Sequence, residues 1–209
     1  MKYDIKKEAG FKASKKPKIF VSDEQNILAI DGQGNPNSQA FQNDVEALYS
    51  IAFPLKMNFK KARLVGEVDS DIDDYVVPPL QGYWTISKEA QIRGSWSKDD
   101  LVYRLEIVIP RQVPLDFINS TMAEVRLKAK NKRSVQVYLT KIPIQQVGHI
   151  LHVGLYDDES DSFNVLEQYL HKEGYQRSSL DHREIYLGDP RKSRPESLRT
   201  LLEVKIESK

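Results

Sequence analysis

The segment ILAIDGQGNPNSQAFQNDVEALYSIAFPLK, residues 27–56, contains a strand pattern, a polar turn and a helix pattern in succession. Its strand part, ILAIDG from Ile27, is similar to ILHVGLY from Ile150. Its helix part, from Phe41 to Leu48, is similar to residues 163–170, at nearly the same distance along the chain. Because residue type and spacing both return, we expect two copies of one structural unit.

Hydrophobic periodicity around these two segments predicts a strand, a helix and two further strands in each half. The expected strands are 26–32, 75–86 and 101–109, then 135–142, 146–156, 183–187 and 198–206, with helices over 41–55 and 162–172. The predicted fold class is α+β: a tandem pseudo-repeat of strand-helix-strand-strand units with antiparallel sheets. We expect the helices on one face of the sheet and a ligand cleft between the units.

The chain divides into an arm and one domain. Residues 1–17 are rich in lysine and predict a solvated basic arm. Residues 18–209 form a single domain in this interpretation, with repeats over about 18–112 and 135–209. A helix over about 114–130, opened by a proline and closed by basic residues, connects the repeats.

Composition excludes several classes of protein. The 209 residues are 40% hydrophobic and 29% charged, which is typical of a soluble globular chain. A net charge of +1 gives no general support to nucleic-acid binding, and the basic clusters at 126–133 and 191–199 lack interleaved aromatic residues. The absence of cysteine excludes disulfides and thiolate chemistry. No apolar run is long enough for a membrane span or a secretory signal, so we expect a cytoplasmic protein.

Strand alternation groups four side chains that carry useful chemistry. In strand 146–156 the apolar set that we expect to meet the helix is Leu151, Val153 and Leu155, which leaves Ile150, His152, Gly154 and Tyr156 on the opposite face. In strand 183–187, Ile185 and Leu187 belong to the core side, and Glu184 and Tyr186 to the other. A carboxylate, an imidazole and two phenols would thus converge on the face away from the helices. The alternative is a hydrated strand face without a ligand.

The segment PPLQGYW, residues 78–84, supplies aromatic residues for a matching wall. Tyr83 and Trp84 follow a glycine, and Tyr103 comes from the next predicted strand. Such rings stack on flat ligands and tolerate half-wet pockets. Packing of Trp84 in the core is an equally good interpretation.

Motifs of other chemistries fail on spacing. His149 and His152 lie three residues apart on a strand, so their rings point to opposite faces and cannot bind one ion. The run DSDIDD from Asp69 lacks the glycine and the final glutamate of a calcium loop, and DDES from Asp157 suits the loop before a helix. No serine-hydrolase, zinc-protease or phosphate-loop motif is present. We therefore expect no metal and no cofactor.

Several segments together resemble the GyrI-like small-molecule-binding proteins. They are ILAIDGQGNPNSQAFQNDVEALYSIAFPLK, YVVPPLQGYW, GHILHVGLYDDES and HREIYLGDPRKSRPESLRTLL, which together with the N-terminal segment span nearly the whole chain in order. The resemblance implies two units related by a pseudo-twofold axis around a cleft, with Glu184 as the glutamate that faces the ligand. The family includes effector domains of multidrug-responsive regulators, gyrase inhibitors and stand-alone proteins. Some stand-alone members hydrolyse the cyclopropane of cyclopropylpyrroloindole compounds.

The resemblance favours a stand-alone protein that binds flat, largely apolar small molecules, with hydrolysis of an activated cyclopropane as its implied reaction. In that function Glu184 is the base and Tyr156 or Tyr186 the proton donor, while the ligand contacts Trp84, Tyr83, His152, Tyr186 and Tyr103. The partner is a small molecule, without direct nucleic-acid or membrane binding. Two alternatives stay open: a non-catalytic protein that sequesters or senses cationic drugs through Glu184, and a protein-interaction module, such as a topoisomerase partner, that uses the basic arm.

Overall fold

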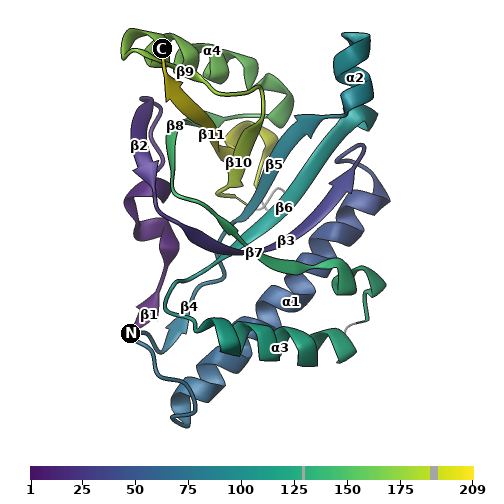
Figure 1. Ribbon diagram of the computed structural model, residues 1–209, viewed down its shortest axis with the longest axis vertical. Helices are drawn as coiled ribbons and strands as arrows, with labels where there is room; N and C mark the ends of the chain where they lie inside the picture. Colours follow the sequence, from purple (N-terminus) through teal and green to yellow (C-terminus); the bar gives the residue numbers. More distant parts are fainter. Residues whose placement is uncertain (129, 189–192) are drawn as a thin grey trace.

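One long antiparallel sheet runs through the computed structural model of the chain (Figure 1), which describes residues 1–128, 130–188 and 193–209. Each strand pairing in this sheet is antiparallel. Its strand order is β2 (Lys18–Ser22), β8 (Gln145–Val153), β11 (Arg199–Ser208), β10 (His182–Tyr186), β5 (Leu80–Ile86), β6 (Leu101–Ile109), β3 (Gln25–Gln33) and β7 (Tyr138–Ile142), with β9 (Tyr175–Arg177) beside β11. The predicted α+β class is confirmed.

Read from either end, the sheet presents corresponding strands of the two halves in the same order. β5 of the first half pairs with β10 of the second half in the middle. At the two edges the halves exchange a strand, because β2 pairs with β8 and β7 pairs with β3. Each half therefore consists of two strands, a helix and two strands. The predicted unit lacked the first of these, since β2 lies at the start of the domain where no strand was expected.

Helices α1 (Gln39–Leu64) and α4 (Ser160–Lys172) cover one face of the sheet, and α3 (Leu115–Lys128) packs against α1. A short helix, α2 (Lys88–Arg93), stands at the tip between β5 and β6 (Figure 1). Helix α1 is longer than the predicted helix over 41–55, because it continues past Pro54 to Leu64. Leu55, Phe59 and Ala62 extend its buried stripe beyond the proline, and this packing outweighs the lost backbone donor. The connecting helix is close to its predicted range, of which residue 129 lies outside the described part.

Apolar cores lie on both faces of the sheet. On the helix side, Leu28 and Ile30 pack with α1, while Ile150 packs with Leu166 and Leu170 of α4. On the other side, a second core contains Ile27, Ala29, Leu151, Ile185 and Leu201. The predicted assignment of faces is therefore wrong: Leu151 and Ile185 lie away from the helices, and Ile150, His152 and Glu184 lie on the helix side.

The N-terminal segment covers this second core. Its short strand β1 (Lys2–Tyr3) pairs in parallel with β4 (Asp74–Tyr75), and two 3-10 turns follow, η1 (Ile5–Lys7) and η2 (Ala9–Phe11). Ile5 and Phe11 are buried against the sheet, whereas the lysines of residues 1–17 are exposed. The expectation of a wholly solvated arm is thus wrong for its apolar residues.

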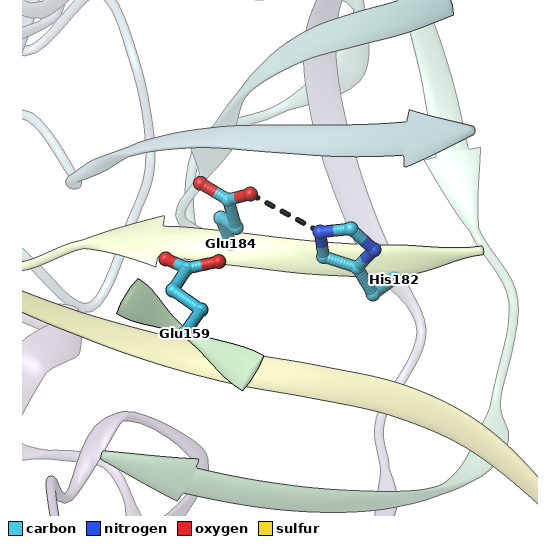
Figure 2. A group of neighbouring side chains, drawn as sticks. All are labelled: Glu159, His182 and Glu184. Carbon is cyan, nitrogen blue, oxygen red and sulfur yellow. Dashed lines mark hydrogen bonds and ion pairs between the residues drawn. The ribbon is translucent and has the colours of Figure 1, made fainter. Parts of the chain in front are cut away.

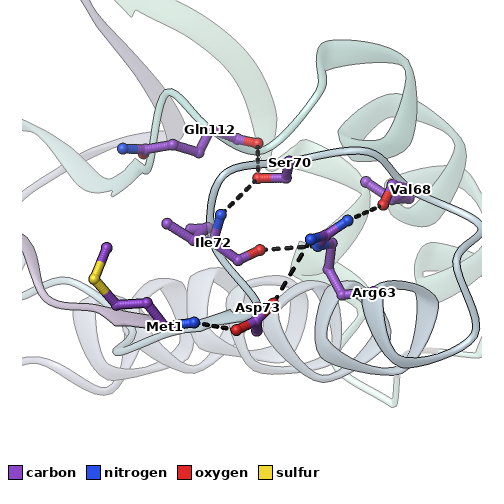
Figure 3. A network of polar contacts seen from close by, with 7 residues as sticks. All are labelled: Met1, Arg63, Val68, Ser70, Ile72, Asp73 and Gln112. Carbon is purple, nitrogen blue, oxygen red and sulfur yellow. Dashed lines mark hydrogen bonds and ion pairs between the residues drawn. The ribbon is translucent and has the colours of Figure 1, made fainter.

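The acidic loop between α1 and β4 is held by contacts to protein groups (Figure 3). Arg63 donates to the carbonyl oxygen of Ile72 at 2.9 Å, Ser70 donates to that of Gln112 at 2.8 Å, and the Met1 amino group contacts Asp73. These contacts give the loop a structural role in joining α1 to the sheet. Among the described helices, none has the length and apolar character that a membrane crossing requires.

Candidate functional site

The candidate site lies in the middle of the sheet, where the two halves meet. β10 and β5 pair there with Glu184 opposite Gly82. His182 and Glu184 are two positions apart on β10, so their side chains share one face of the sheet. This face is the one that the helices cover, since the His182 ring contacts Phe163 of α4 with ring centroids 5.0 Å apart. On the neighbouring strand, Trp84 stacks on Phe41 of α1 at 5.9 Å. The site therefore lies between α4 and α1.

Two buried carboxylates and an imidazole form the polar centre of the site (Figure 2). Glu184 and Glu159 are only 8% and 7% exposed, and Glu159 directly precedes α4. The His182 Nε2 atom lies 3.1 Å from the Glu184 Oε1 atom. One ligand atom from each of the three side chains lies within 4.8 Å of the other two. Acidic and basic groups from two separate elements thus meet in a space with little access to water.

Burial controls the charge of this centre. Burial, together with the neighbouring carboxylates of Glu184 and Asp157, raises the pKa of Glu159 to about 9. Burial and the nearby Glu184 also raise the pKa of Tyr186 well above its ordinary value. In the absence of a bound cation, Glu159 keeps its proton at neutral pH and the Tyr186 phenol stays neutral. The site thus offers proton donors beside the carboxyl group of Glu184.

An aromatic wall closes the side of the site towards α1. The Trp84 Nε1 atom donates to the Tyr186 hydroxyl at 3.0 Å. A Cβ atom at position 82 would lie 2.5 Å from that nitrogen and 2.9 Å from that hydroxyl, so only glycine leaves room for the bond. The Tyr156 ring meets the Tyr186 ring edge-on at 5.6 Å and is 37% exposed. The two phenols therefore extend from the buried centre to the surface.

The structure brings together four of the seven residues that the sequence singled out: Glu184, Tyr186, Trp84 and Tyr156. His152 lies on the same face, but its Nδ1 atom contacts the Ser162 hydroxyl at 3.0 Å and its Nε2 atom the Leu155 carbonyl at 2.9 Å. Its ring thereby holds the turn before α4. Unlike His152, His149 is fully buried on the opposite face, as its spacing predicted.

The remaining two tyrosines do not reach Glu184. Tyr103 is buried behind Trp84 and donates to Asp44 at 2.9 Å. Tyr83 lies on the opposite face of the sheet, donates to Asp181 at 3.0 Å, and has the Arg183 guanidinium over its ring. Tyr83 is therefore not among the residues that surround the carboxylates, because neighbouring positions of a strand point to opposite faces.

Sequence reasoning missed His182 and Glu159. His182 stands two positions before Glu184, so strand alternation could have placed both on one face. The acidic run that includes Glu159 was interpreted as complementing the helix dipole. In the structure, however, the Glu159 side chain makes no capping hydrogen bond to α4. Only the packing of α4 against the sheet, with Phe163 on His182, brings the Glu159 carboxylate to the site.

Asp157 connects the segment before α4 to the opposite half of the molecule. Its carboxylate forms an ion pair with the Lys98 Nζ atom at 2.7 Å, and Lys98 lies at the tip between β5 and β6. Both partners are partly exposed, so this contact contributes little stability by itself. It does place the two segments side by side near the exposed end of the site.

Comparisons with known proteins agree with this architecture. No family model matches the sequence, and no curated protein matches it. A hydrolase from Listeria innocua has a TM-score of 0.82 and 27% identity, over 99% of this chain and 100% of that chain. An uncharacterized conserved protein from Listeria innocua has a TM-score of 0.80 and 27% identity, over 98% and 99% of the chains. The C-terminal domain of EcmrR has a TM-score of 0.52 and 11% identity over 92% and 98%, and is similar in fold alone. The shared architecture is consistent with the GyrI-like fold that the sequence resembles.

Proposed function

We propose that this protein is a cytoplasmic hydrolase of small, flat, largely apolar molecules, with Glu184 as the group that activates water. The observation that carries the proposal is the buried carboxylate of Glu184 beside the phenol of Tyr186, at a junction lined by aromatic rings. A carboxylate in such surroundings can take a proton from water, while a phenol can donate to an oxygen that gains charge. The hydrolase from Listeria innocua, which matches the full length of the chain, supports a hydrolytic reaction.

The substrate class that the sequence resemblance implies is an activated cyclopropane of the cyclopropylpyrroloindole type. The oxygen of water bonds to the cyclopropane methylene carbon, and the strained carbon–carbon bond breaks. Its electron pair moves through the conjugated rings to the carbonyl oxygen, which takes up a proton and becomes a phenol. The second proton of water stays on the new hydroxyl group, and the product is the substrate plus one water.

We assign the roles within this proposed reaction from the contacts of the candidate site. Glu184 accepts the proton of water, and His182 orients Glu184 from 3.1 Å. Tyr186 or Tyr156 donates to the carbonyl oxygen, a contribution of about 3 kcal/mol for one well-placed donor. Trp84 is a positioning residue, since it is buried and holds the Tyr186 hydroxyl through its Nε1 atom.

The test is a mass measurement on the product. Purified protein incubated with a cyclopropylpyrroloindole should convert it to a species heavier by one water. A Tyr83→Phe variant is the matched control, because it removes a phenol from the opposite face of the same junction and should keep full turnover. Recovery of unchanged compound, bound or free, would overturn the proposed reaction.

A second candidate is a non-catalytic binder of cationic aromatic compounds. Two carboxylates beside partly exposed tyrosine rings favour it, because a flat cation can stack on the rings and pair with the acids. Matched cationic and neutral aromatic compounds would then raise the melting temperature differently, with the larger increase for the cation. Equal shifts would contradict this candidate.

A further inference from the structure

We propose that Glu159, His182 and Glu184 bind one divalent transition-metal ion of the zinc type. The inference deepens the proposed function, on which it rests for the role of the ion, since the same three residues surround the water that would be activated. It also goes against the sequence-based expectation of a site without metal. Four features of the site support it: spacing, a free ligand atom, donor chemistry and charge.

The spacing of the three side chains is close to that of a metal centre. One ligand atom of each lies within 4.8 Å of the other two. A tetrahedral ion with bonds of about 2.0 to 2.2 Å holds its ligands about 3.3 to 3.6 Å apart. Side-chain rotations that bring the most distant ligand atoms closer by about 1 to 1.5 Å would therefore complete the centre. Figure 2 shows Glu184 and His182 on one strand with the Glu159 carboxylate beside them.

Glu159 supplies a ligand atom that has no other use in the described structure. Its Oε1 atom is buried and has no hydrogen-bond partner among the described residues. The side chain stands at the start of α4 yet does not cap it. A buried carboxylate oxygen without a partner is costly, and a metal–oxygen bond would satisfy it. This atom is independent evidence that the cluster is arranged for a ligand.

The donor set is of a kind that zinc accepts, since zinc in proteins binds histidine nitrogen and carboxylate oxygen. Two carboxylate oxygens and one imidazole nitrogen provide three protein ligands, which leaves a fourth position open for water. The charge of the site also suits a dication, because an ion between Glu159 and Glu184 would displace the proton of Glu159 and balance the charges of both carboxylates. An ion bound there would lower the pKa of its water, and Glu184, bound through one carboxylate oxygen, would accept the proton of that water on the other oxygen.

The experiment measures zinc binding directly. Chelator-treated protein is titrated with Zn²⁺ by calorimetry, and the bound zinc is counted by elemental analysis after gel filtration. We expect one zinc per chain. Glu159→Gln and His182→Gln should each weaken binding at least tenfold, whereas Asp158→Asn should leave it unchanged. Asp158 is the matched control, because it is an exposed carboxylate adjacent to Glu159. Circular dichroism of each variant checks that it is folded.

The outcomes separate this inference from the proposed function. No stoichiometric zinc on the wild-type protein, or equal affinity in the folded Glu159→Gln and His182→Gln variants, would overturn the metal site. Hydrolysis by zinc-free protein at the full rate would also overturn the role of the ion and leave the proposed function in place. Stoichiometric zinc together with unchanged substrate would support the metal site and overturn the hydrolase.

Discussion

The starts of α1 and α4 occupy equivalent places in the two halves and differ in what precedes them. α1 follows Ser38, whose hydroxyl accepts a hydrogen bond from the Phe41 amide at 3.2 Å. α4 follows Glu159, whose carboxylate makes no such bond and lies near Glu184 instead. In the first half the residue at this position stabilises the helix through a capping hydrogen bond. In the second half the same position carries a buried carboxyl group that makes no capping bond. The candidate site residue Glu159 thus occupies a place where the second half departs from ordinary local structure.

The central strands show the same division. β5 contributes Trp84 and the glycine that makes room for it, whereas β10 contributes His182 and Glu184. Because these strands pair with each other, the aromatic wall of one half lies directly beside the charged groups of the other. A nearly symmetrical backbone therefore carries an asymmetrical site.

The largest expected effect is on turnover, and it compares a substitution in the second half with one in the first half. Glu184→Gln should lower turnover by about 10²–10⁴-fold, the usual contribution of a general base, while a neutral ligand still binds. Ser38→Ala in the first half should leave turnover unchanged, because it alters only the cap of α1. Steady-state rates of both variants provide the measurement. A fully active glutamine variant would remove Glu184 from the reaction.

A second effect tests whether every buried polar group without a partner belongs to a functional site. His149 is fully buried on the opposite face, and neither of its ring nitrogens has a hydrogen-bond partner in the described part of the chain. Burial lowers its pKa from 6.5 to about 4, so the folded protein takes up this proton less readily than the unfolded chain. Its stabilising contribution is complete above about pH 6.5 and is lost as the pH falls towards 4, by about 3 kcal/mol.

His149→Leu should therefore flatten the loss of stability between pH 6.5 and 4, measured by urea denaturation, without changing turnover. This result would show that His149 affects only stability. An unpartnered polar group would then indicate function at Glu159, on the helix side, and not at His149. An unchanged acid dependence in the leucine variant would show that other groups control it.

The smallest expected effects come from substitutions at the residues that precede the two helices. Ser38→Ala should destabilise the protein by about 1 kcal/mol, the usual value of a helix cap. Glu159→Ser should stabilise it by a similar amount in the presence of a chelator, because it adds a cap and removes a buried carboxyl group. Urea denaturation measures both. A destabilised serine variant would mean that the Glu159 carboxyl supports the fold, and the comparison between the halves would fail.

Sequence alone predicted the class of fold and which of several candidate site residues share a face, because strand alternation is a geometric rule. It placed His152, Glu184 and Tyr186 on one face, where the structure also has them. It could not say which face the helices cover, since Ile5 and Phe11 bury the other face equally well. The same rule, applied to the adjacent Tyr83 and Trp84, already separates these two rings.

Other features depend on tertiary packing that local patterns do not contain. An acidic residue before a helix ordinarily complements the helix dipole, so nothing in the sequence directs Glu159 towards β10. The segments β2 and β3 follow each other with only Asp23 and Glu24 between them, which suggests a hairpin. In the structure β2 pairs with β8 instead. Such an exchange is set by contacts between residues far apart in the chain.

The exchanged outer strands constrain how a ligand can enter. Parting the two halves would break the pairing of β5 with β10 and also those of β2 with β8 and of β3 with β7. The two halves therefore cannot move apart about a hinge, as independently folded lobes do, without breaking the sheet. Entry of the proposed substrate would instead require local motion of the turn around Asp157 and the strand tip around Lys98, and breaking their ion pair costs far less than separating the strands of a sheet.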